Sequence, residues 1–285
     1  MSAAAMFLRQ LGWEIRKLCA RPRSYLGFAA CLLFELALIL LYRTTALAEL
    51  VGDVYWRVPS AIATTTLSGL TVATHVTAET TSVIGALFLA LVAGDMIANE
   101  SEERTLHMIF SRPVTRGAVV LQKVIVCVLY TIVFCVFVGV TALGIALLVE
   151  GPGPVVVVSA KESLVGVHEF APGLQRYALA VAMLGPCWVT FTLLGFFLSC
   201  CRMKPGAATV VATALLLTDH VLRIQPTFAG YLPYSLGTRI LTWRQPFAYE
   251  ISWLRIERNL SQLLLLDVVL ILLAWWVFRR RELAP

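Results

Sequence analysis

Long apolar runs separated by short polar segments set the pattern of this chain. Six runs stand out, at residues 25–42, 83–98, 119–149, 174–200, 207–224 and 260–278. An α-helix needs about 20 apolar residues to cross the roughly 30 Å hydrocarbon core of a bilayer. The pattern therefore predicts an all-α polytopic membrane protein, with residues 1–285 forming one bundle of about six transmembrane helices. Residues 62–82 can extend the short second run, and the long third run is expected to tilt or project.

The segment before the first run is amphipathic rather than apolar. Leu8, Leu11, Ile15 and Leu18 recur at helical spacing, while charged residues take the opposite face. Pro22 then ends the pattern, because proline is poorly tolerated inside a helix. Residues 1–24 are thus predicted to form an interfacial helix that lies along the bilayer surface.

Composition and charge support a membrane protein and give its orientation. Hydrophobic residues make up 59% of the chain and charged residues only 14%, whereas soluble domains are nearer half and a quarter. The net charge is +6, and its basic residues lie beside the apolar runs, as they do when they set membrane orientation. We therefore expect a multi-pass protein of the cell membrane with both termini in the cytoplasm. Its partner is the lipid bilayer, and nucleic acid is not expected to bind.

Enzyme motifs are missing from the full sequence. It has no GxxxxGK[ST] phosphate-binding loop, no HExxH and no GxSxG. Its four histidines are scattered, and its seven cysteines show no zinc-binding spacing. We therefore expect no catalytic residue, no cofactor-binding residue and no metal ligand, and the chain is not expected to be an enzyme.

Three acidic residues within or near the ends of apolar runs are candidates for a role inside the membrane. They are Glu35, Asp95 and Asp267. A charge at the bilayer centre costs about 2.5–3.5 kcal/mol on insertion scales, so such residues usually face a cavity or a partner. They either line a polar path or proton relay, or are neutral acids held by hydrogen bonds between helices, and the sequence leaves both interpretations open.

Residues 99–118 form the only strongly charged block between two apolar runs. Acids come first, a small apolar cluster follows, and proline and arginine close it. The residues concerned are Glu100, Glu102, Glu103, Leu106, Ile109, Phe110, Pro113 and Arg116. Acids near the start and bases near the end suit a short helix. The pattern predicts an amphipathic coupling helix that presents its apolar stripe to a groove on a partner. The alternative is a solvated return loop with ordinary basic flanks.

This block resembles the permease subunits of type-2 ABC transporters. That family shows E-x-E-x-G-T-L after the second span, then P-V-[ST]-R and a lysine entering the third span. The chain follows this order with Glu100, Glu102, Glu103, Thr105-Leu106, Pro113-Val114-Thr115-Arg116 and Lys123. It departs at Arg104 and Gln122, where the family often has glycine. The N-terminal helix is also similar to the family's elbow helix.

The resemblance implies that the chain docks a separate ATP-binding-cassette ATPase through residues 99–118 and pairs with a second permease copy. ATP would be bound by the ATPase, so that this chain needs no cofactor while it exports an unidentified substrate. Two other hypotheses stay open. The chain could be an ATP-independent secondary transporter or channel that uses its intramembrane acids. It could also be a permease-like subunit that transmits ATP-driven motion to an external partner.

Overall fold

The computed structural model describes residues 3–43, 68–103, 115–159 and 164–280. In these ranges six helices are long and apolar enough to cross a membrane. They are Pro22–Arg43, Gly69–Glu102, Arg116–Glu150, Phe170–Cys200, Pro205–Ile224 and Trp253–Arg280. The expected all-α membrane fold is therefore confirmed.

The elements in chain order are α1 (Ala3–Cys19), α2 (Pro22–Arg43), α5 (Gly69–Thr80), η1 (Thr81–Gly85), α6 (Ala86–Glu102), α8 (Arg116–Glu150), β1 (Val155–Ser159), β2 (Leu164–His168), α9 (Phe170–Cys200), α10 (Pro205–Ile224), η2 (Pro226–Tyr231), α11 (Leu236–Ile240), η3 (Leu241–Phe247) and α12 (Trp253–Arg280). The second span consists of α5, η1 and α6, and η1 is one turn of π-helix.

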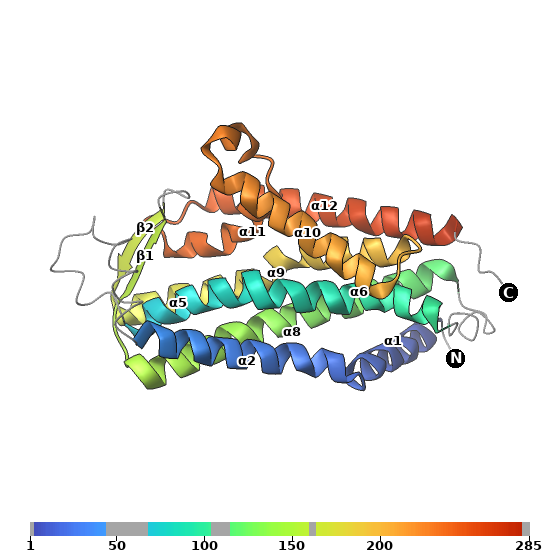
Figure 1. Ribbon diagram of the computed structural model, residues 1–285, viewed down its shortest axis with the longest axis horizontal. Helices are drawn as coiled ribbons and strands as arrows, with labels where there is room; N and C mark the ends of the chain where they lie inside the picture. The colour runs from blue at the N-terminus through green and yellow to red at the C-terminus, as the bar shows by residue number, and fades with distance from the viewer. Residues whose placement is uncertain (1–2, 44–67, 104–114, 160–163, 281–285) are drawn as a thin grey trace.

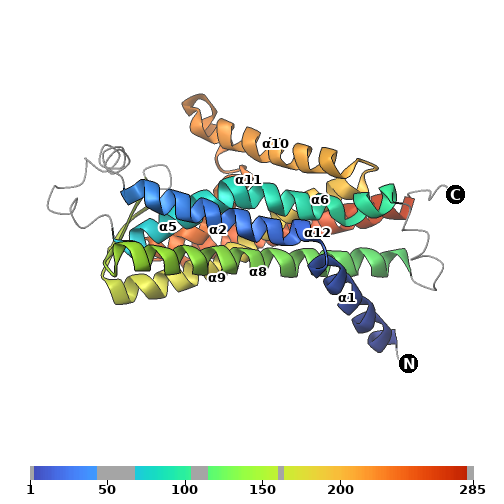
Figure 2. The ribbon, with the colours of Figure 1, turned by 60° about the horizontal axis from the view of Figure 1, so that its bottom comes forward.

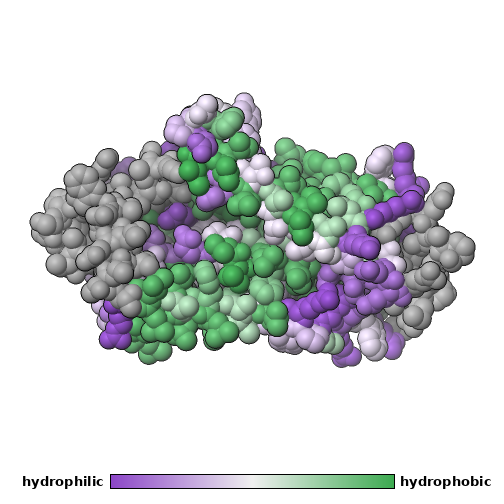
Figure 3. Space-filling view, viewed as in Figure 1, coloured by the Kyte–Doolittle hydropathy of each residue, from purple (hydrophilic) through white to green (hydrophobic). Residues whose placement is uncertain are grey.

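The long helices lie side by side along one axis, and the two ends of the bundle differ (Figure 1). We call the end that carries α1, the end of α6 and the start of α8 the charged end. The opposite end carries the β1–β2 hairpin, and we call it the hairpin end. Helix α1 leaves the bundle at an angle (Figure 2). Hydrophobic residues cover much of the flank, and hydrophilic residues gather at the charged end (Figure 3).

The sixth span and one hairpin differ from what the sequence predicts, because the sixth span begins at Trp253 rather than at residue 260. The second span begins at Gly69, within the extension at residues 62–82 that the sequence allows. The second is longer because threonine hydroxyls bond to carbonyls of their own helix: Thr74 Oγ1 donates to Leu70 O at 2.9 Å. Such bonds satisfy the hydroxyl groups within the helix, so that this stretch can belong to a span. The antiparallel hairpin, with Val155 opposite His168, adds a small sheet to the expected all-α fold.

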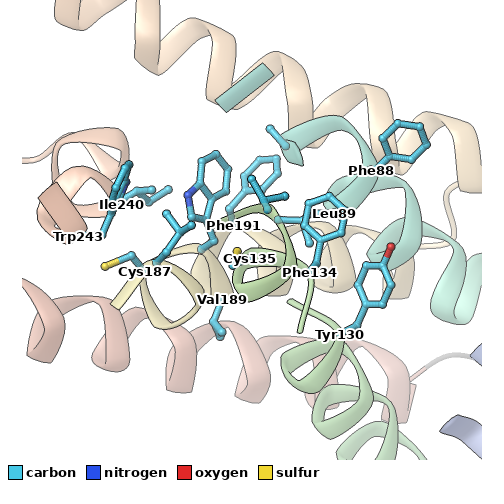
Figure 4. Packing of buried hydrophobic residues seen from close by; sticks show 14 of the residues in the cluster. Phe88, Leu89, Tyr130, Phe134, Cys135, Cys187, Val189, Phe191, Ile240 and Trp243 are labelled. Carbon is cyan, nitrogen blue, oxygen red and sulfur yellow. The ribbon is translucent and has the colours of Figure 1, made fainter. Parts of the chain in front are cut away.

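Helix α9 and the second span form the buried centre of the bundle. Aromatic and aliphatic side chains from α6, α8 and α9 fill the space between them (Figure 4). Helices α8 and α9 approach closely at Gly139, where an added Cβ would lie 2.6 Å from Val181. Thr131 Oγ1 also donates to Thr192 Oγ1 at 2.9 Å, which joins the same two helices. Small residues and hydroxyl bonds of this kind are how helices associate in lipid.

At the hairpin end the segment between α10 and α12 folds back against the bundle. Asp219 near the end of α10 accepts hydrogen bonds from Tyr231 Oη at 2.8 Å and Ser235 Oγ at 3.0 Å. Its carboxylate also accepts from the backbone N–H groups of Leu236 at 3.1 Å and Gly237 at 3.0 Å, at the start of α11. One buried carboxylate therefore fixes the path of the returning chain.

The hairpin and the first part of α9 are each held to η3 by one basic side chain. The His168 Nε2 atom lies 3.1 Å from the Phe247 carbonyl oxygen, and Arg176 Nη1 donates to the Pro246 carbonyl at 2.7 Å. Burial lowers the pKa of His168, and the neighbouring Arg176 adds to this effect, while hydrogen bonds to backbone carbonyls oppose it. The neutral imidazole is thus the form that suits this contact.

Candidate functional site

The ends of α6 and α8 that flank residues 104–114 are both well-formed helix termini. Thr115 caps α8 by accepting a hydrogen bond from the backbone N–H of Ala118 at 3.3 Å. The backbone N–H of Glu103 closes α6 by donating to the Asn99 carbonyl at 2.9 Å. Capping residues of this type fix where a helix starts. The charged block is therefore bounded by two defined helix ends.

A buried network of charges ties these two helix ends to each other and to α1. Lys123 of α8 lies 2.7 Å from Glu100 of α6 and 3.1 Å from Glu14 of α1, measured from Nζ to the carboxylate oxygens. Lys17 of α1 also contacts the same Glu100 oxygen. The Lys123 and Glu100 side chains are each only 1% exposed. Along the network the charges alternate, so each buried charge has an opposite one beside it, as burial of an ion requires.

Neutral hydrogen bonds extend this attachment along α1. Gln122 Nε2 of α8 donates to Gln10 Oε1 of α1 at 2.8 Å. At the junction of α1 and α2, Ser24 Oγ donates to the Leu18 carbonyl at 2.8 Å, and Tyr130 Oη of α8 donates to the Ser24 carbonyl at 3.1 Å. Helix α1 projects from the bundle, yet its polar face and its end are bonded to α8.

The end of α12 joins the same region through α8. Arg116 Nη1 donates to the Arg279 carbonyl at 2.8 Å, in the last turn of α12, where a cation also suits the helix dipole. The guanidinium groups of Arg279 and Arg280 lie over the rings of Trp275 and Trp276, at 5.4 and 4.1 Å from the centroids. Such Arg–Trp pairs are typical of the level where lipid headgroups begin.

The structure separates the residues that the sequence assigns to ATPase coupling. Glu100 is buried and bonded within the chain, so it does not belong to the exposed docking surface that the sequence predicts. Glu102 and Glu103 are exposed at the end of α6. Leu106, Ile109, Phe110 and Pro113 lie outside the described residues. Arg116 takes part in the contact with α12. A docking role for the exposed and undescribed members stays a prediction.

The three intramembrane acids have different surroundings. Asp95 pairs with Arg23, at 2.9 Å, and so belongs to the charged end. Glu35 is 0% exposed and lies beside Thr141, whereas Asp267 is 7% exposed and lies beside Thr190. The structure therefore gives each acid its own neighbours, and a role in a polar path or proton relay stays a prediction.

Sequence reasoning missed the members of the network on α1. Gln10, Glu14 and Lys17 follow at spacings of four and three residues, which is one face of a helix. The sequence shows that this face is polar, but it does not show that the face meets α8 and α6 instead of water. Lys123 appears in the sequence only as the last residue of the matching motif, and the structure makes it the centre of the network.

No metal site is evident in the described part of the chain. No group of three or more histidine, cysteine, aspartate or glutamate side chains there could hold a metal ion. The seven cysteines are free thiols, most of them buried in the bundle. What the charged end shows is an arrangement in which α1, α6 and α8 are bonded together.

Comparison with known proteins places this arrangement in a family. The model of the family described as "ABC-2 family transporter protein" matches residues 11–192, from within α1 to within α9. No curated protein sequence matches the chain. The matched range is more than half of the chain and includes both ends of the charged block and all the residues of the network except Gln10. The chain therefore belongs to the ABC-2 family of transporter proteins, as a membrane-spanning permease.

Proposed function

We propose that the chain couples ATP hydrolysis by a separate ATPase subunit to export of a substrate across the cell membrane. The ATPase docks at residues 99–118, and its movement reaches the bundle there. The ATPase binds the nucleotide, so this chain needs no cofactor of its own. The observation that supports the proposal is the buried network of Glu14, Lys17, Glu100 and Lys123 beside this segment.

The network explains how a force applied between the end of α6 and the start of α8 would move whole helices. A push on residues 104–114 acts on the ends of α6 and α8, and Glu100 and Lys123 bind these ends to each other. Because Glu14 and Lys17 bind α1 to the same pair, the three helices respond together. Interior packing is stiff, so displacement at one end is carried along the helices instead of being absorbed locally.

The proposed orientation puts the charged end in the cytoplasm. Basic residues near span ends favour that side, and Arg16, Lys17, Arg279 and Arg280 all lie at this end. Both termini are then cytoplasmic, and the hairpin end faces outward. A second permease copy, identical or related, completes a working unit with two ATPases.

Co-purification with the ATPase tests the docking surface. The double variant Glu102→Lys, Glu103→Lys reverses two exposed charges at the end of α6. We expect it to insert normally but to recover far less of the ATP-binding-cassette protein that accompanies the tagged wild-type chain in native membranes. Glu257→Lys, an exposed acid on α12 near the hairpin end, is the matched control and should leave recovery unchanged.

Two results would contradict the proposal. One is wild-type recovery of the ATPase by the double variant. The other is full transport by the purified chain in vesicles without any nucleotide-hydrolysing subunit, which would favour the secondary transporter or channel instead.

A further inference from the structure

The buried face of α2 carries a carboxylic acid deep in the bundle. Cys31, Glu35 and Ile39 follow one another at intervals of four residues, and each is 0% exposed. This face packs against α8, α5 and the π-helical turn η1. Glu35 lies more than two helical turns from either end of α2, so its carboxyl group is remote from both ends of this span.

The Glu35 carboxyl group is buried without a partner that would stabilise a charge. Neither of its oxygens has a hydrogen-bond partner in the described part of the chain. Three other buried acids differ, because Asp95 has Arg23, Glu100 has Lys123, and Asp219 has both backbone donors and a cation. Asp267, which lies beside Thr190, resembles Glu35 in that its Oδ1 atom has no hydrogen-bond partner among the described residues. An isolated ionised carboxylate in such surroundings is so costly that the group takes up a proton instead.

The hydrogen-bonding groups around Glu35 fit a neutral acid. The Thr141 side chain lies beside it. The single proton of the Thr141 hydroxyl is used within α8, where Oγ1 donates to the Phe137 carbonyl at 2.8 Å. Toward Glu35, Thr141 can therefore only accept a hydrogen bond. A neutral carboxylic acid has one O–H to donate, whereas a carboxylate has none.

The other titratable groups around this position supply no counter-charge. Cys31 on the same helix and Tyr177 from α9 interact electrostatically with Glu35, and both are neutral at physiological pH. Helix α8 contributes Cys135, which is neutral for the same reason. From α5, Glu79 interacts with the Tyr42 side chain, one to two turns beyond Glu35 along α2, and its charge would repel a second carboxylate.

We propose that Glu35 is a proton-binding site of the bundle, which holds a proton while α2 is packed on α8 and releases it when α2 separates from α8 and water enters. The first half stands on the packing alone. The second half rests on the proposed function, since the ATP-driven movement provides the separation. Transport would then include uptake and release of one proton at this site in each cycle.

Infrared spectroscopy of the purified protein tests the first half. A neutral carboxylic acid has a C=O stretch that a carboxylate lacks, so the wild type minus Glu35→Gln difference spectrum should show this band at neutral pH. Asp95→Asn is the matched control, because Asp95 is paired with Arg23 and its loss should remove no acid band. Absence of an acid band in the Glu35→Gln difference would overturn the proposal.

Removing the Thr141 oxygen tests whether Thr141 serves as an acceptor for the proton proposed on Glu35. Thr141→Val keeps the shape of the side chain and deletes its oxygen. We expect the Glu35 band to persist but to shift to higher frequency, since the O–H loses its acceptor. An unshifted band would overturn the assignment of Thr141 as the acceptor, and disappearance of the band would overturn the view that burial alone keeps Glu35 neutral.

A pH series provides a second readout if Glu35→Gln changes the spectrum through altered packing. Ionising Glu35 in the packed state is unfavourable, so the wild type should lose thermal stability relative to Glu35→Gln as the pH rises. A difference between the two melting temperatures that stays constant with pH would overturn the proposal.

The release step is tested in the complex with its ATPase. ATP and vanadate, which hold the ATPase pair closed, should abolish the Glu35 acid band in the wild type and leave Glu35→Gln without a change in this region. An unchanged band in a complex that hydrolyses ATP would overturn the release step. If no ATPase is found, the proposed function fails, but the spectra of the chain alone still decide whether Glu35 is neutral.

Discussion

Removal of the Lys123 charge perturbs the charged end at its most buried point. Lys123→Met keeps the length of the side chain and deletes the ammonium that contacts both Glu100 and Glu14. Removing one partner of a buried ion pair costs about 3–5 kcal/mol, because the other charge stays behind. Lys17, which is 39% exposed, still contacts Glu100 in the variant. We therefore expect a loss near the lower end of that range, about 3 kcal/mol.

A double-mutant cycle separates the interaction from general damage. The free energy of unfolding is measured in mild detergent by titration with a denaturing detergent, for the wild type, Lys123→Met, Glu100→Gln and the double variant. Residues in contact couple by about 0.5–3 kcal/mol, so the double variant should be more stable than the sum of the single losses predicts. Glu103→Gln, an exposed acid in the same turn of the chain, is the control and should stay within about 0.5 kcal/mol of the wild type.

Charge reversal gives a stricter test of the alternating network. Exchanging the charges of only Glu100 and Lys123 places a new acid against Glu14 and a new base against Lys17, so it should not restore stability. Reversing all four charges restores the alternation and should recover part of the loss. The reasoning is refuted if Lys123→Met costs no more than Glu103→Gln, or if the single losses simply add.

The hairpin end and the helix contacts provide three more tests. Asp219→Ala removes the hydrogen-bond acceptor for two side chains and two backbone N–H groups, so it should lower the free energy of unfolding by about 1–3 kcal/mol. The control is His220→Ala, an exposed residue on the same helix, which should have little effect. Gly139→Ala inserts a methyl group where α8 and α9 touch, and should lower the free energy of unfolding by about 1–3 kcal/mol. Gly144→Ala places its methyl group in open space and should be neutral or stabilising. Thermal unfolding measures both. Folding lowers the pKa of His168, so the contribution of this residue to stability should be complete above about pH 6.5 and should be lost as the pH falls toward the pKa in the folded state. His168→Gln should reduce this pH dependence in a pH series of melting curves.

The six spans could be predicted because the length of an apolar run is enough to indicate a membrane helix. Their starts could not be predicted equally well. Residues 69–80 are rich in threonine, so the sequence offers them only as an extension of the run at 83–98 and does not fix where the span begins. The structure shows why they do belong, since Thr77 Oγ1 pairs with Tyr177 Oη at 2.7 Å, and Thr81 Oγ1 donates to the Thr77 carbonyl at 2.7 Å. The Thr81 bond is local, but the Thr77 hydroxyl is satisfied by a tertiary contact, which no hydropathy window contains.

The hairpin illustrates a second limit. The apolar run at Val155–Val158 is short, and a run of that length does not distinguish a strand from part of a helix. Its identity as a strand depends on pairing with residues 164–168, and on Thr71, whose Oγ1 accepts from the Val156 backbone N–H at 3.0 Å. Thr71 comes from a distant part of the chain, so the local pattern could not reveal its contact with the strand.

Glu100 shows where the prediction of the site and its structure diverge. As one of three acids in a charged block, it is indistinguishable in sequence from Glu102 and Glu103. In the fold its carboxylate points to Lys123 and is buried, whereas the other two are exposed. Neighbours on a helix point in different directions, so adjacent acids take different roles. The described part of the charged block thus divides into exposed acids and a buried acid that binds α6 to α8 and α1. In the proposed function, a force applied to the first is transmitted through the second.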